Sequence, residues 1–568
     1  MPGFKAFAVR AAGLATNLVH RGNVGQQVSA LASSEGCGND IPGPQPPAGG
    51  NWLGWGAGPY NNRWAASDAV VSTKNIANLT KVCSVPYSGA GQSAAPLVTG
   101  GVAYYPTFTG LLVALDYQAC SEVWSINVTR IIEDFGPVPI EYAKPMVSRT
   151  TPALDKDGDV LFIGTLAHAL VLAIDRSSGR LIDSIQLDTN PYAILTQSQT
   201  FYGGRLYAGV SSTESVVPSV GACCSFVGSL NAVSLVGGRL RHEWGVQTLP
   251  HTSPANADLG GAAVWGSQPS IDPIRKQVFF GSGNLYNIPP DFVDCVRQTA
   301  NISIIEQGLV GRDPCLPIET YQDSIMAVDL ETGRVNWAKQ LGQLDAWNAG
   351  CFEGFAAAPG TCPETPGPDA DFGMAPTFVP GSPETPAGQD IIVAGQKSGK
   401  LYALYAQTGT VAWAIQTGPG GLEGGLTWGV AVDDKAVYFT NTNSDRKPFT
   451  MPDGQVISNS AFGAASLKDG RILWLTPAPD NHDSFVAPTV VNDVVLTGTT
   501  GARGERLDPI GPGYLTPLDK NTGNILRQIE MDAVFRGGMA AVGDYVLFGT
   551  GYGGFHGLVQ GSFSVWNV

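Results

Sequence analysis

One pattern of fourteen residues recurs along this chain and constrains its fold more than any other feature. Its fullest copy runs from Ser324 to Trp337 and reads SIMAVDLETGRVNW. Apolar residues alternate with others up to Asp329, the turn at Gly333 tolerates a positive φ, and the alternation then resumes up to the tryptophan. The pattern predicts a β-hairpin. Because a single hairpin is marginally stable in water, its copies must bury a common core.

The copies number seven, and they begin at Ala114, Ala173, Ala232, Ala327, Ala403, Ala464 and Pro517. Each copy follows another two-strand unit, so two hairpins make one four-stranded blade. An eighth unit combines residues 539–549 with the C-terminal strand 561–566. We therefore predict an all-β fold, an eight-bladed β-propeller of four-stranded blades with disulfide-bearing loop insertions, closed by joining both chain ends in one blade. A tandem of β-sandwiches would not repeat one turn signature seven times.

The regular pattern begins near residue 51. We expect residues 1–50 to be a leader and an irregular N-terminal segment, and residues 51–568 to be a single propeller domain whose first strand lies within 70–82. The segment Met1–His20 is a poor secretion signal, because Arg10 interrupts its apolar stretch. The alternatives are a misassigned start codon, an atypical leader, or a protein that stays inside the cell. We nevertheless expect the protein to enter the secretory pathway.

Composition narrows the classes of partner. The charged fraction is 14%, with 72 Gly and 40 Pro, which is typical of turn-rich β structure and not of helical bundles or disorder. The net charge of −15 argues against nucleic acid and anionic membrane surfaces as partners. No run of about 18 apolar residues is found, so we expect no membrane span.

Nine cysteines are many for a reducing compartment, and they favour disulfides. The predicted pairs are Cys83 with Cys120, Cys295 with Cys315, Cys351 with Cys362, and Cys223 with Cys224, which leaves Cys37 over. The adjacent pair closes only a strained ring, so two free thiols remain the alternative there. Three glycosylation sequons, at Asn78, Asn127 and Asn301, agree with a secretory route.

Several stretches occur in a shared order that points to one family. They are Trp55–Trp64, Ser211–Glu214, Cys223–Ser229, Ala263–Gly266, Gly281–Asn284, Asp345–Cys351, Asp371–Gly373, Gly395–Gly399 and Gly418–Gly429. Together with the repeat, they resemble quinoproteins, the eight-bladed propellers that bind pyrroloquinoline quinone (PQQ). The likeness extends from Trp52 to the end of the chain and is to the polyvinyl-alcohol-dehydrogenase-like branch of that family.

The resemblance implies a cofactor site for PQQ. Trp265 or Trp428 would form the flat floor under the quinone, although the alternative is packing between blades, which we expect of the blade-end residues Trp337, Trp413 and Trp474. Lys397 would hydrogen-bond the reactive oxygens of the cofactor and take part in catalysis. The Cys223–Cys224 pair would lie against the cofactor.

The resemblance also implies a calcium ion, which prefers oxygen ligands. Asn284 would offer its carbonyl oxygen, and Glu214 or Asp371 a carboxylate. Simpler alternatives are that Asn284 shapes a turn after a strand and that Glu214 is a solvated loop carboxylate. Six histidines show no metal-ligand spacing, so zinc is not expected.

The catalytic base is where the chain departs from the family pattern. Alcohol dehydrogenases of the wider family carry Asp after the tryptophan of the segment found here as Trp347-Asn348, and an amide cannot take up a proton at neutral pH. Asp345 or Asp371 would have to replace it, with a raised pKa.

These features predict a secreted PQQ- and calcium-dependent dehydrogenase that oxidises a secondary alcohol or polyol, a small-molecule substrate. Electrons would pass to an external acceptor, since the chain has no heme-attachment motif. The alternative, favoured by Asn348, is a propeller that lost redox chemistry and catalyses a cofactor-free cyclisation or pericyclic step in its central cavity, because orienting a reactive substrate needs no strong base. Neither reading indicates an oligomeric state.

Overall fold

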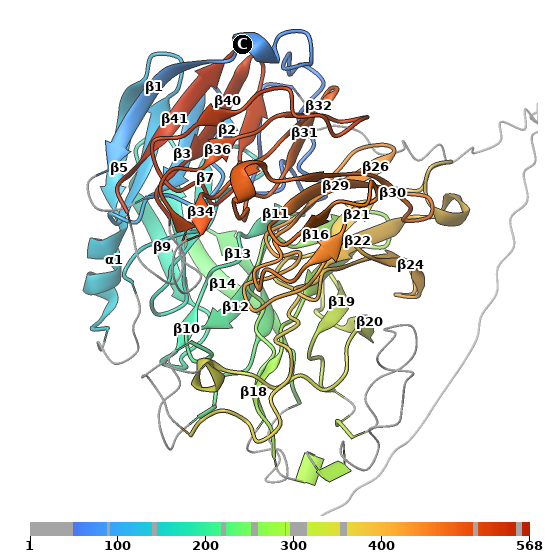
Figure 1. Ribbon diagram of the computed structural model, residues 1–568. Helices are drawn as coiled ribbons and strands as arrows, with labels where there is room; N and C mark the ends of the chain where they lie inside the picture. The colour runs from blue at the N-terminus through green and yellow to red at the C-terminus, as the bar shows by residue number, and fades with distance from the viewer. Residues whose placement is uncertain are drawn as a thin grey trace, which may run out of the picture. The chain divides into compact units, whose positions relative to one another are not determined.

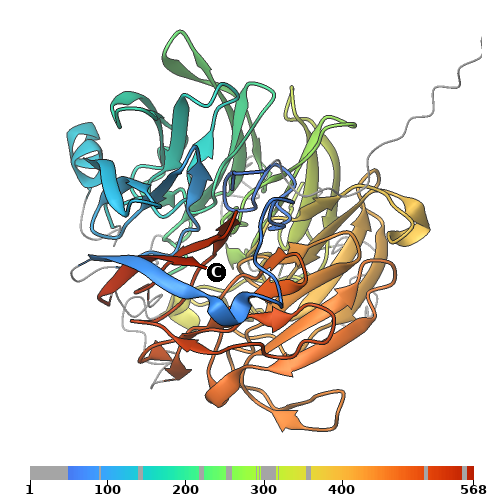
Figure 2. The same cartoon turned by 90° about the horizontal axis from the view of Figure 1, so that it is seen from above.

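The computed structural model describes residues 49–568, apart from 88–90, 139–144, 217–222, 251–258, 290, 293, 296–314, 318, 353–359, 504–508 and 553–558. The described residues belong to one compact unit, Pro42–Val568. Antiparallel sheets follow one another around this unit as the blades of a propeller (Figures 1 and 2). The all-β propeller predicted from the sequence is confirmed. The leader as far as residue 48, with Cys37, and the sequon at Asn301 lie outside the described residues.

Five sheets have four strands in chain order from one edge to the other. They are β2 (Leu97–Thr99), β3 (Val102–Pro106), β4 (Leu111–Asp116) and β5 (Ser121–Asn127); β6 (Ala153–Leu154), β7 (Val160–Gly164), β8 (Leu170–Asp175) and β9 (Leu181–Gln186); β16 (Ser270–Asp272), β17 (Gln277–Gly281), β19 (Ser324–Asp329) and β20 (Val335–Gln340); β21 (Thr377–Val379), β22 (Ile391–Gly395), β23 (Lys400–Tyr405) and β24 (Val411–Gln416); and β25 (Ala431–Val432), β26 (Ala436–Asn441), β29 (Ala461–Ser466) and β30 (Ile472–Pro477). A sixth sheet has five strands, β10 (Ala193–Ile194), β11 (Thr200–Tyr202), β12 (Arg205–Ser212), β13 (Ser229–Val236) and β14 (Arg239–Gln247).

The turn of the repeated hairpin is held by its aspartate. Oδ1 of Asp329 accepts hydrogen bonds from the N–H groups of Glu331 and Thr332, at 3.1 and 2.9 Å, and from the Thr332 hydroxyl at 2.8 Å. Gly333 follows with φ of +69°, and its N–H donates to the carbonyl of Asp329 at 3.0 Å. The spacing Asp-x-x-Thr-Gly is therefore the sequence of a side-chain-capped turn that ends in a left-handed residue.

Tryptophans at the end of the repeat join neighbouring blades, as predicted. Nε1 of Trp337 donates to the carbonyl of Ala406 in the next blade at 3.1 Å. The indole also lies against Gly409, the turn glycine of that blade, where any Cβ would overlap the ring. Trp413 and Trp474 contact their next blades in the same way. Each hairpin turn is thus also a contact between blades.

The two ends of the described chain meet in one sheet. β1 (Thr80–Tyr87) pairs antiparallel with the C-terminal strand β41 (Gly561–Asn567), with Val85 opposite Phe563, and β40 (Tyr545–Gly549) and β39 (Ala540–Val542) complete the sheet. Figure 1 shows the blue strand beside the red ones. The predicted closing blade is confirmed.

The first strand begins later than predicted. The prediction placed it within 70–82, whereas β1 starts at Thr80. The N–H of Val70 donates to Gly543 at 2.8 Å, and the carbonyl of Val71 accepts the amide of Asn492 at 2.9 Å. Because these backbone groups bond to loops and not to a strand, this segment forms no ladder; Val71 is buried there, whereas Val70 is exposed.

The number of sheets differs from the prediction of eight. Counting every described sheet of three or more strands gives nine, because residues 489–530 form two three-stranded sheets. These are β31 (Thr489–Val491), β32 (Val494–Leu496) and β37 (Leu518–Asp519), and β33 (Gly498–Thr499), β36 (Tyr514–Leu515) and β38 (Ile529–Glu530). Only Thr497 separates β32 from β33. These strands count as two sheets because the hydrogen-bonded ladder is briefly interrupted between consecutive strands.

The remaining elements are short. They are β15 (Gly260–Gly261) with β18 (Leu285–Asn287), β27 (Phe449–Thr450) with β28 (Val456–Ile457), β34 (Ala502–Arg503) with β35 (Pro509–Ile510), α1 (Val128–Phe135), and the 3-10 turns η1 (Ile76–Asn78), η4 (Ala349–Cys351), η5 (Pro386–Gly388) and η6 (Pro479–Asn481). Among the described helices, none has the length and apolar character needed to cross a membrane.

All four predicted disulfides are formed. They are Cys83–Cys120, Cys223–Cys224, Cys295–Cys315 and Cys351–Cys362. Two of them close loop insertions after β18 and β20, which is where the prediction expected disulfide-bearing insertions.

Candidate active site

Two of the predicted site residues form a buried ion pair in the centre of the candidate site. Nζ of Lys397, just after β22, lies 3.0 Å from Oδ2 of Asp371 and 2.9 Å from Oδ2 of Asp369. All three side chains are at most 10% exposed. The backbone joins the same segments, since the N–H of Lys397 donates to the carbonyl of Asp371 at 3.0 Å. The strand end therefore fixes the ammonium group on the loop that precedes β21.

Two further predicted residues donate to the same carboxylate. The N–H of Asn284 donates to Oδ1 of Asp371 at 2.5 Å, and Nε1 of Trp265 donates to Oδ2 at 3.2 Å. Gly283 brings the backbone close enough for this, because a Cβ there would overlap the Asp371 carboxylate. Asp371 is thus held by groups from three segments: the loop before β16, the end of β17 and the end of β22.

The side chain of Asn284 is oriented by one hydrogen bond. Its Nδ2 donates to the carbonyl of Trp347 at 2.9 Å, which directs Oδ1 the other way. Among the described residues, no donor reaches that oxygen. Asn284 therefore does more than shape the turn before β18: it presents a free carbonyl oxygen beside Asp371.

Both predicted floor residues lie at this site and contact each other. The rings of Trp265 and Trp428 pack edge to face, 5.6 Å between centroids and at 85°. The ammonium of Lys397 lies 5.4 Å from the centre of the Trp265 ring, a favourable cation–π distance. Trp265 consequently contacts the charged cluster directly, while Trp428 lines a neighbouring pocket.

The charged groups of this cluster shift one another's pKa values. Burial lowers the pKa of Lys397, but the carboxylates of Asp369 and Asp371 raise it more, so its net pKa lies above the ordinary value. Burial raises the pKa of Asp369 to about 8, with Lys397 opposing and Asp371 adding to the rise. Lys397 therefore stays positively charged, and its single ammonium group pairs with two buried acidic side chains.

Asp345 lies away from the ion pair and holds a loop. Its Oδ1 and Oδ2 accept the backbone N–H groups of Asp369, at 3.1 Å, and Ala370, at 2.6 Å. It is 1% exposed, and burial raises its pKa to about 6 although the two N–H groups oppose this. Of the two predicted bases, Asp371 therefore lies among Trp265 and Lys397, whereas Asp345 supports the segment that leads to Asp371.

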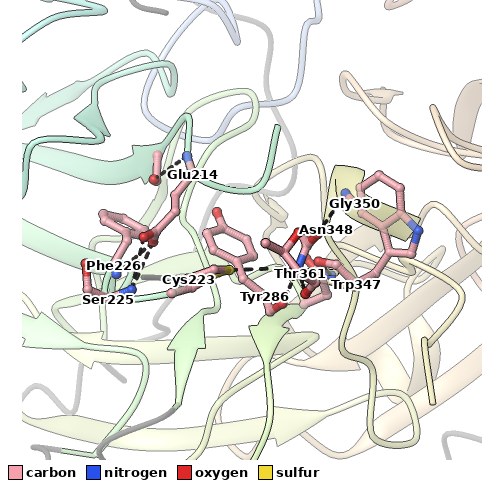
Figure 3. Close-up of a disulfide and its surroundings, with 12 residues drawn as sticks. Glu214, Cys223, Ser225, Phe226, Tyr286, Trp347, Asn348, Gly350 and Thr361 are labelled. Carbon is pink, nitrogen blue, oxygen red and sulfur yellow. Dashed lines mark hydrogen bonds between the residues drawn. A yellow bond between two sulfur atoms is a disulfide. The ribbon is translucent and has the colours of Figure 1, made fainter. Parts of the chain in front are cut away.

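Asn348 has every polar atom of its side chain engaged (Figure 3). Nδ2 donates to the carbonyls of Tyr286 and Thr361, both at 2.9 Å, and Oδ1 accepts from the N–H of Gly350 at 2.8 Å and the Thr361 hydroxyl at 3.2 Å. The residue is fully buried. Asn348 therefore holds its loop in place at the start of η4.

Glu214 is buried and serves the loop of the adjacent cysteines. Its carboxylate accepts the N–H groups of Ser225, at 3.1 Å, and Phe226, at 2.9 Å, so the solvated alternative is wrong. Burial raises the pKa of Glu214, against these hydrogen bonds. In Figure 3, Tyr286 lies between Glu214 and Asn348, and Cys223 lies near both. Burial raises the pKa of Tyr286, and the charges of Asp371 and Glu214 add to the rise.

A pocket next to Trp428 contains residues that the sequence did not single out. Its volume is about 30 Å³, and it is lined by Trp55, Ser93, Ala94, Arg149, Thr196, Ser198, Ser267, Trp428, Arg536, Gly537 and Tyr552. The guanidinium groups of Arg149 and Arg536 lie 5.3 and 6.0 Å from the centre of the Trp428 ring, and each lies 5.9 Å from that of Tyr552. Two cations therefore face one small cavity.

These arginines are only partly neutralised. Nη1 of Arg149 donates to the hydroxyl of Tyr552 at 2.9 Å, and Nη2 of Arg536 lies 3.5 Å from Glu423. Among the described residues, Nε of Arg536 and Nε1 of Trp428 are buried without a hydrogen-bond partner. Buried donors without partners are costly, so an anion in the pocket would satisfy them. An arginine before two glycines, Arg536-Gly537-Gly538, was the available sequence signal, but no spacing linked it to Arg149.

The chain is similar to named dehydrogenases. It is 24% identical to the polyvinylalcohol dehydrogenase of Pseudomonas sp. over 75% of this chain, and 26% identical to that of Sphingopyxis sp. strain 113P3 over 85%. The chain spans 59% and 67% of the lengths of these relatives. A PQQ-repeat family model, described as outer membrane protein assembly factor BamB, matches residues 321–511.

The fold is shared with solved structures. The quinohemoprotein alcohol dehydrogenase of Comamonas testosteroni superposes with a TM-score of 0.64 at 15% identity, covering 91% of this chain and 80% of that one. A europium-containing methanol dehydrogenase gives 0.64 at 14% identity, covering 91% and 98%. The predicted resemblance to quinoprotein-type propellers of the polyvinyl-alcohol-dehydrogenase-like kind is confirmed.

Proposed function

We propose that this chain, a propeller that resembles quinoprotein alcohol dehydrogenases, uses PQQ and calcium to oxidise a secondary alcohol or a polyol. Electrons would pass to a separate acceptor. The observation that carries the proposal is the convergence of Trp265, Asn284 and Lys397 on the carboxylate of Asp371. It joins a flat aromatic surface, a free amide oxygen, a cation and a carboxylate at one place.

The residues present fit PQQ, a planar quinone that carries carboxylate groups. Trp265 offers an indole surface, and the pocket beside it holds the unpartnered donors of Arg536 and Trp428. The cavity of about 30 Å³ exceeds the roughly 10–15 Å³ that one bound water needs by the same measure, so a small polar group can enter it. Arginine binds carboxylates with paired donors. Arg149 and Arg536 would therefore hold a carboxylate of the cofactor.

The donor set also suits calcium, a hard cation that takes oxygen ligands. Asn284 would supply Oδ1, and Asp371 a carboxylate oxygen. Glu214 is the weaker candidate, because its oxygens already accept the Ser225 and Phe226 amides. A metal ligand at Asp371 would compete with Lys397 for Oδ2.

Different residues of the chain would have different roles in the oxidation. The bound quinone supplies a two-electron acceptor for the alcohol. Asp371 would accept the hydroxyl proton at a carboxylate oxygen, and Lys397 would stabilise the negative charge that develops nearby. Trp265 would fix the plane of the ring through stacking and, through Nε1, the orientation of Asp371.

The observation that favoured the non-redox alternative no longer supports it. It depended on Asn348 standing where a base is needed, but the side chain of Asn348 fastens a loop. A buried carboxylate, Asp371, is available beside Trp265 instead. Base-assisted oxidation therefore has the stronger support.

We further propose that the two three-stranded sheets of residues 489–530 form one blade, which gives eight blades, in a single domain that begins near residue 51. Secretion is supported by the four disulfides and by the exposed positions of Asn78 and Asn127 in two sequons, which could carry glycans.

The test is a titration of the purified full-length protein with PQQ, with and without calcium, followed by tryptophan fluorescence. Dye reduction with secondary alcohols and polyols then measures turnover. We expect micromolar or tighter binding that calcium strengthens. The matched variant Asp371→Asn should bind PQQ and lose turnover. A protein that fails to bind PQQ at micromolar concentration, with or without calcium, would contradict the proposal.

A further inference from the structure

The outer strands of the blades share one position that contacts the next blade. In β20, Trp337 lies opposite Ala327 directly after a bulge, and its ring lies against Gly409, the turn glycine of the next blade. The same position holds Trp124, Trp244, Trp413 and Trp474, which lie against Gly179, Gly333, Gly470 and Gly523. We call this place in the outer strand the contact position, because it joins one blade to the hairpin turn of the next.

A polar residue occupies the contact position in β9. Asp183 lies there, opposite Ala173 and directly after the bulge. Its Oδ1 pairs with Nη1 of Arg239 at 3.0 Å, and its Oδ2 accepts the N–H of Leu240 at 2.8 Å. Both partners directly follow Gly238, the turn glycine of the next blade. The contact position therefore keeps its partner turn even where its residue is not tryptophan.

The closing blade, which consists of β39, β40, β41 and β1, has a cysteine at the contact position. In β1 a bulge lies between Lys81 and Cys83, and Cys83 pairs with Val565 of β41 directly after it. Trp337 and Ala327 have the same arrangement in β20 and β19. The next blade in the ring is that of β2 to β5. We call the contact between these two blades the closing junction.

The hairpin turn on the other side of the closing junction has a cysteine at the place of the glycine. Cys120 follows Asp116 by four residues, the spacing that separates Asp329 from Gly333. Oδ1 of Asp116 accepts the N–H groups of the second and third residues after it, at 3.0 and 2.8 Å. Cys120 has φ of +53°, a left-handed backbone that favours glycine. Its disulfide with Cys83 therefore joins the contact position of one blade to the turn of the next.

The same two blades meet a second time beside the pocket. Phe108 precedes β4, whereas Cys120 follows it. The Phe108 ring stacks on that of Tyr552, which follows β40, with 4.9 Å between the ring centres. The hydroxyl of Tyr552 accepts Nη1 of Arg149 at 2.9 Å. The closing junction thus extends from the disulfide to the pocket of the two arginines.

We propose that the Cys83–Cys120 disulfide replaces the tryptophan–glycine contact at the closing junction and fixes β1 for its pairing with β41. β1 is the strand that the N-terminal part of the chain contributes to the closing blade, so the disulfide fixes the strand against which the C-terminal strand is held. It also keeps Phe108 and Tyr552 in contact. This structural role does not depend on the proposed function; only the effect on PQQ affinity rests on it.

Two double variants separate the contact between blades from the covalent link. The open variant, Cys83→Ala with Cys120→Gly, removes both. The rebuilt variant, Cys83→Trp with Cys120→Gly, places at the closing junction the pair of residues found in β20 and the turn after it. Loss of any disulfide destabilises a protein by freeing its unfolded chain, so the recovery in the rebuilt variant is the diagnostic result. We expect the open variant to melt several degrees below wild type and the rebuilt variant to recover most of that loss.

Cys83→Trp alone is the matched control. It adds the same ring but keeps the side chain of Cys120, and a Cβ at this turn should overlap the ring as it would at Gly409. We expect it to melt below the rebuilt variant. A rebuilt variant that is no more stable than the open variant, or than this control, would overturn the proposal.

Hydrogen exchange followed by mass spectrometry locates the effect. The amides of β1 and β41 should exchange faster in the open variant than in wild type, because their strand pairing opens more often. Those of β23 and β24, in another blade, should not change. Exchange in β1 and β41 that equals wild type would overturn the proposal, even if the rebuilt variant failed to fold.

Titration with PQQ tests the link between the closing junction and the pocket. Affinity should fall severalfold in the open variant and return in the rebuilt variant, because Tyr552 contacts Arg149. Equal affinity in wild type and the open variant would overturn this link. If wild type itself does not bind PQQ, the proposed function fails, and the melting and exchange results still decide the role of the disulfide.

Discussion

The ammonium nitrogen of Lys397 lies 3.0 Å from Oδ2 of Asp371, and it is also the partner of Asp369. One cation therefore neutralises two buried carboxylates, so Lys397 is needed for stability as well as for any chemistry at Asp371. From sequence we would have expected its loss to leave the fold intact. The two ion pairs change that expectation.

Replacing Lys397 with methionine should abolish dye reduction and destabilise the protein. Removing one partner of a buried ion pair costs about 3–5 kcal/mol at neutral pH. The loss should shrink as pH falls, because Asp369, whose pKa burial raises to about 8, would then bind a proton and need no cation. Thermal melts at pH 5 and pH 8 measure it, and an equal loss at both would contradict the reasoning. Lys397→Arg is the control: it should recover most stability but little turnover, because a planar guanidinium cannot replace a point charge.

Asn348→Asp should not create a better enzyme. Nδ2 of Asn348 donates to the carbonyls of Tyr286 and Thr361, so a carboxylate there would face two acceptors. We expect a loss of stability of about 2–4 kcal/mol, the cost of two unsatisfied buried groups, and no gain in turnover. Urea denaturation and dye reduction test this. A gain in turnover would show that position 348 is the site of the base after all.

Arg149→Met and Arg536→Met should each weaken PQQ binding. A hydrogen bond to a charged group contributes about 1.5–3 kcal/mol, which is roughly a tenfold to a hundredfold change in Kd. The matched control is Arg130→Met, because Arg130 lies on the exposed face of α1 and pairs only with Asp134 there. Fluorescence titration measures all three. If Arg130→Met weakened binding as much as the pocket variants, the role of the pocket would be disproved.

The fold could be predicted because its signals are local. The turn around Asp329 is made by residues within five positions of one another. Each copy of the repeat can therefore be recognised from a short stretch of sequence. The four disulfides also joined cysteines that are near in sequence. The start of β1 was missed because the backbone groups of Val70 and Val71 bond to loops more than 400 residues away, and no local pattern records such a contact.

The candidate site could be predicted only through motifs. Trp265, Asn284, Asp371 and Lys397 each lie in a short recognisable segment, and the structure brings these four together. The choice between Asp345 and Asp371 could not be made from sequence, since both follow loops and only the hydrogen bonds distinguish them. Arg149 was missed for the same reason: the pocket that it lines is built with residues of other blades and loops.

Gly409→Ala should destabilise the propeller by about 2–4 kcal/mol, from left-handed backbone strain and an overlap in a packed contact. Gly409 has φ of +69°, and a Cβ there would meet the ring of Trp337 from the preceding blade. Gly238 separates the two causes. It occupies the same turn with φ of +75°, but the nearest atom to its Cβ would be in Ile182, at 4.0 Å. Gly238→Ala should therefore cost only the strain, about 1–2 kcal/mol. Denaturant unfolding compares the two. Equal losses would mean that the tryptophan contact between blades adds nothing to stability.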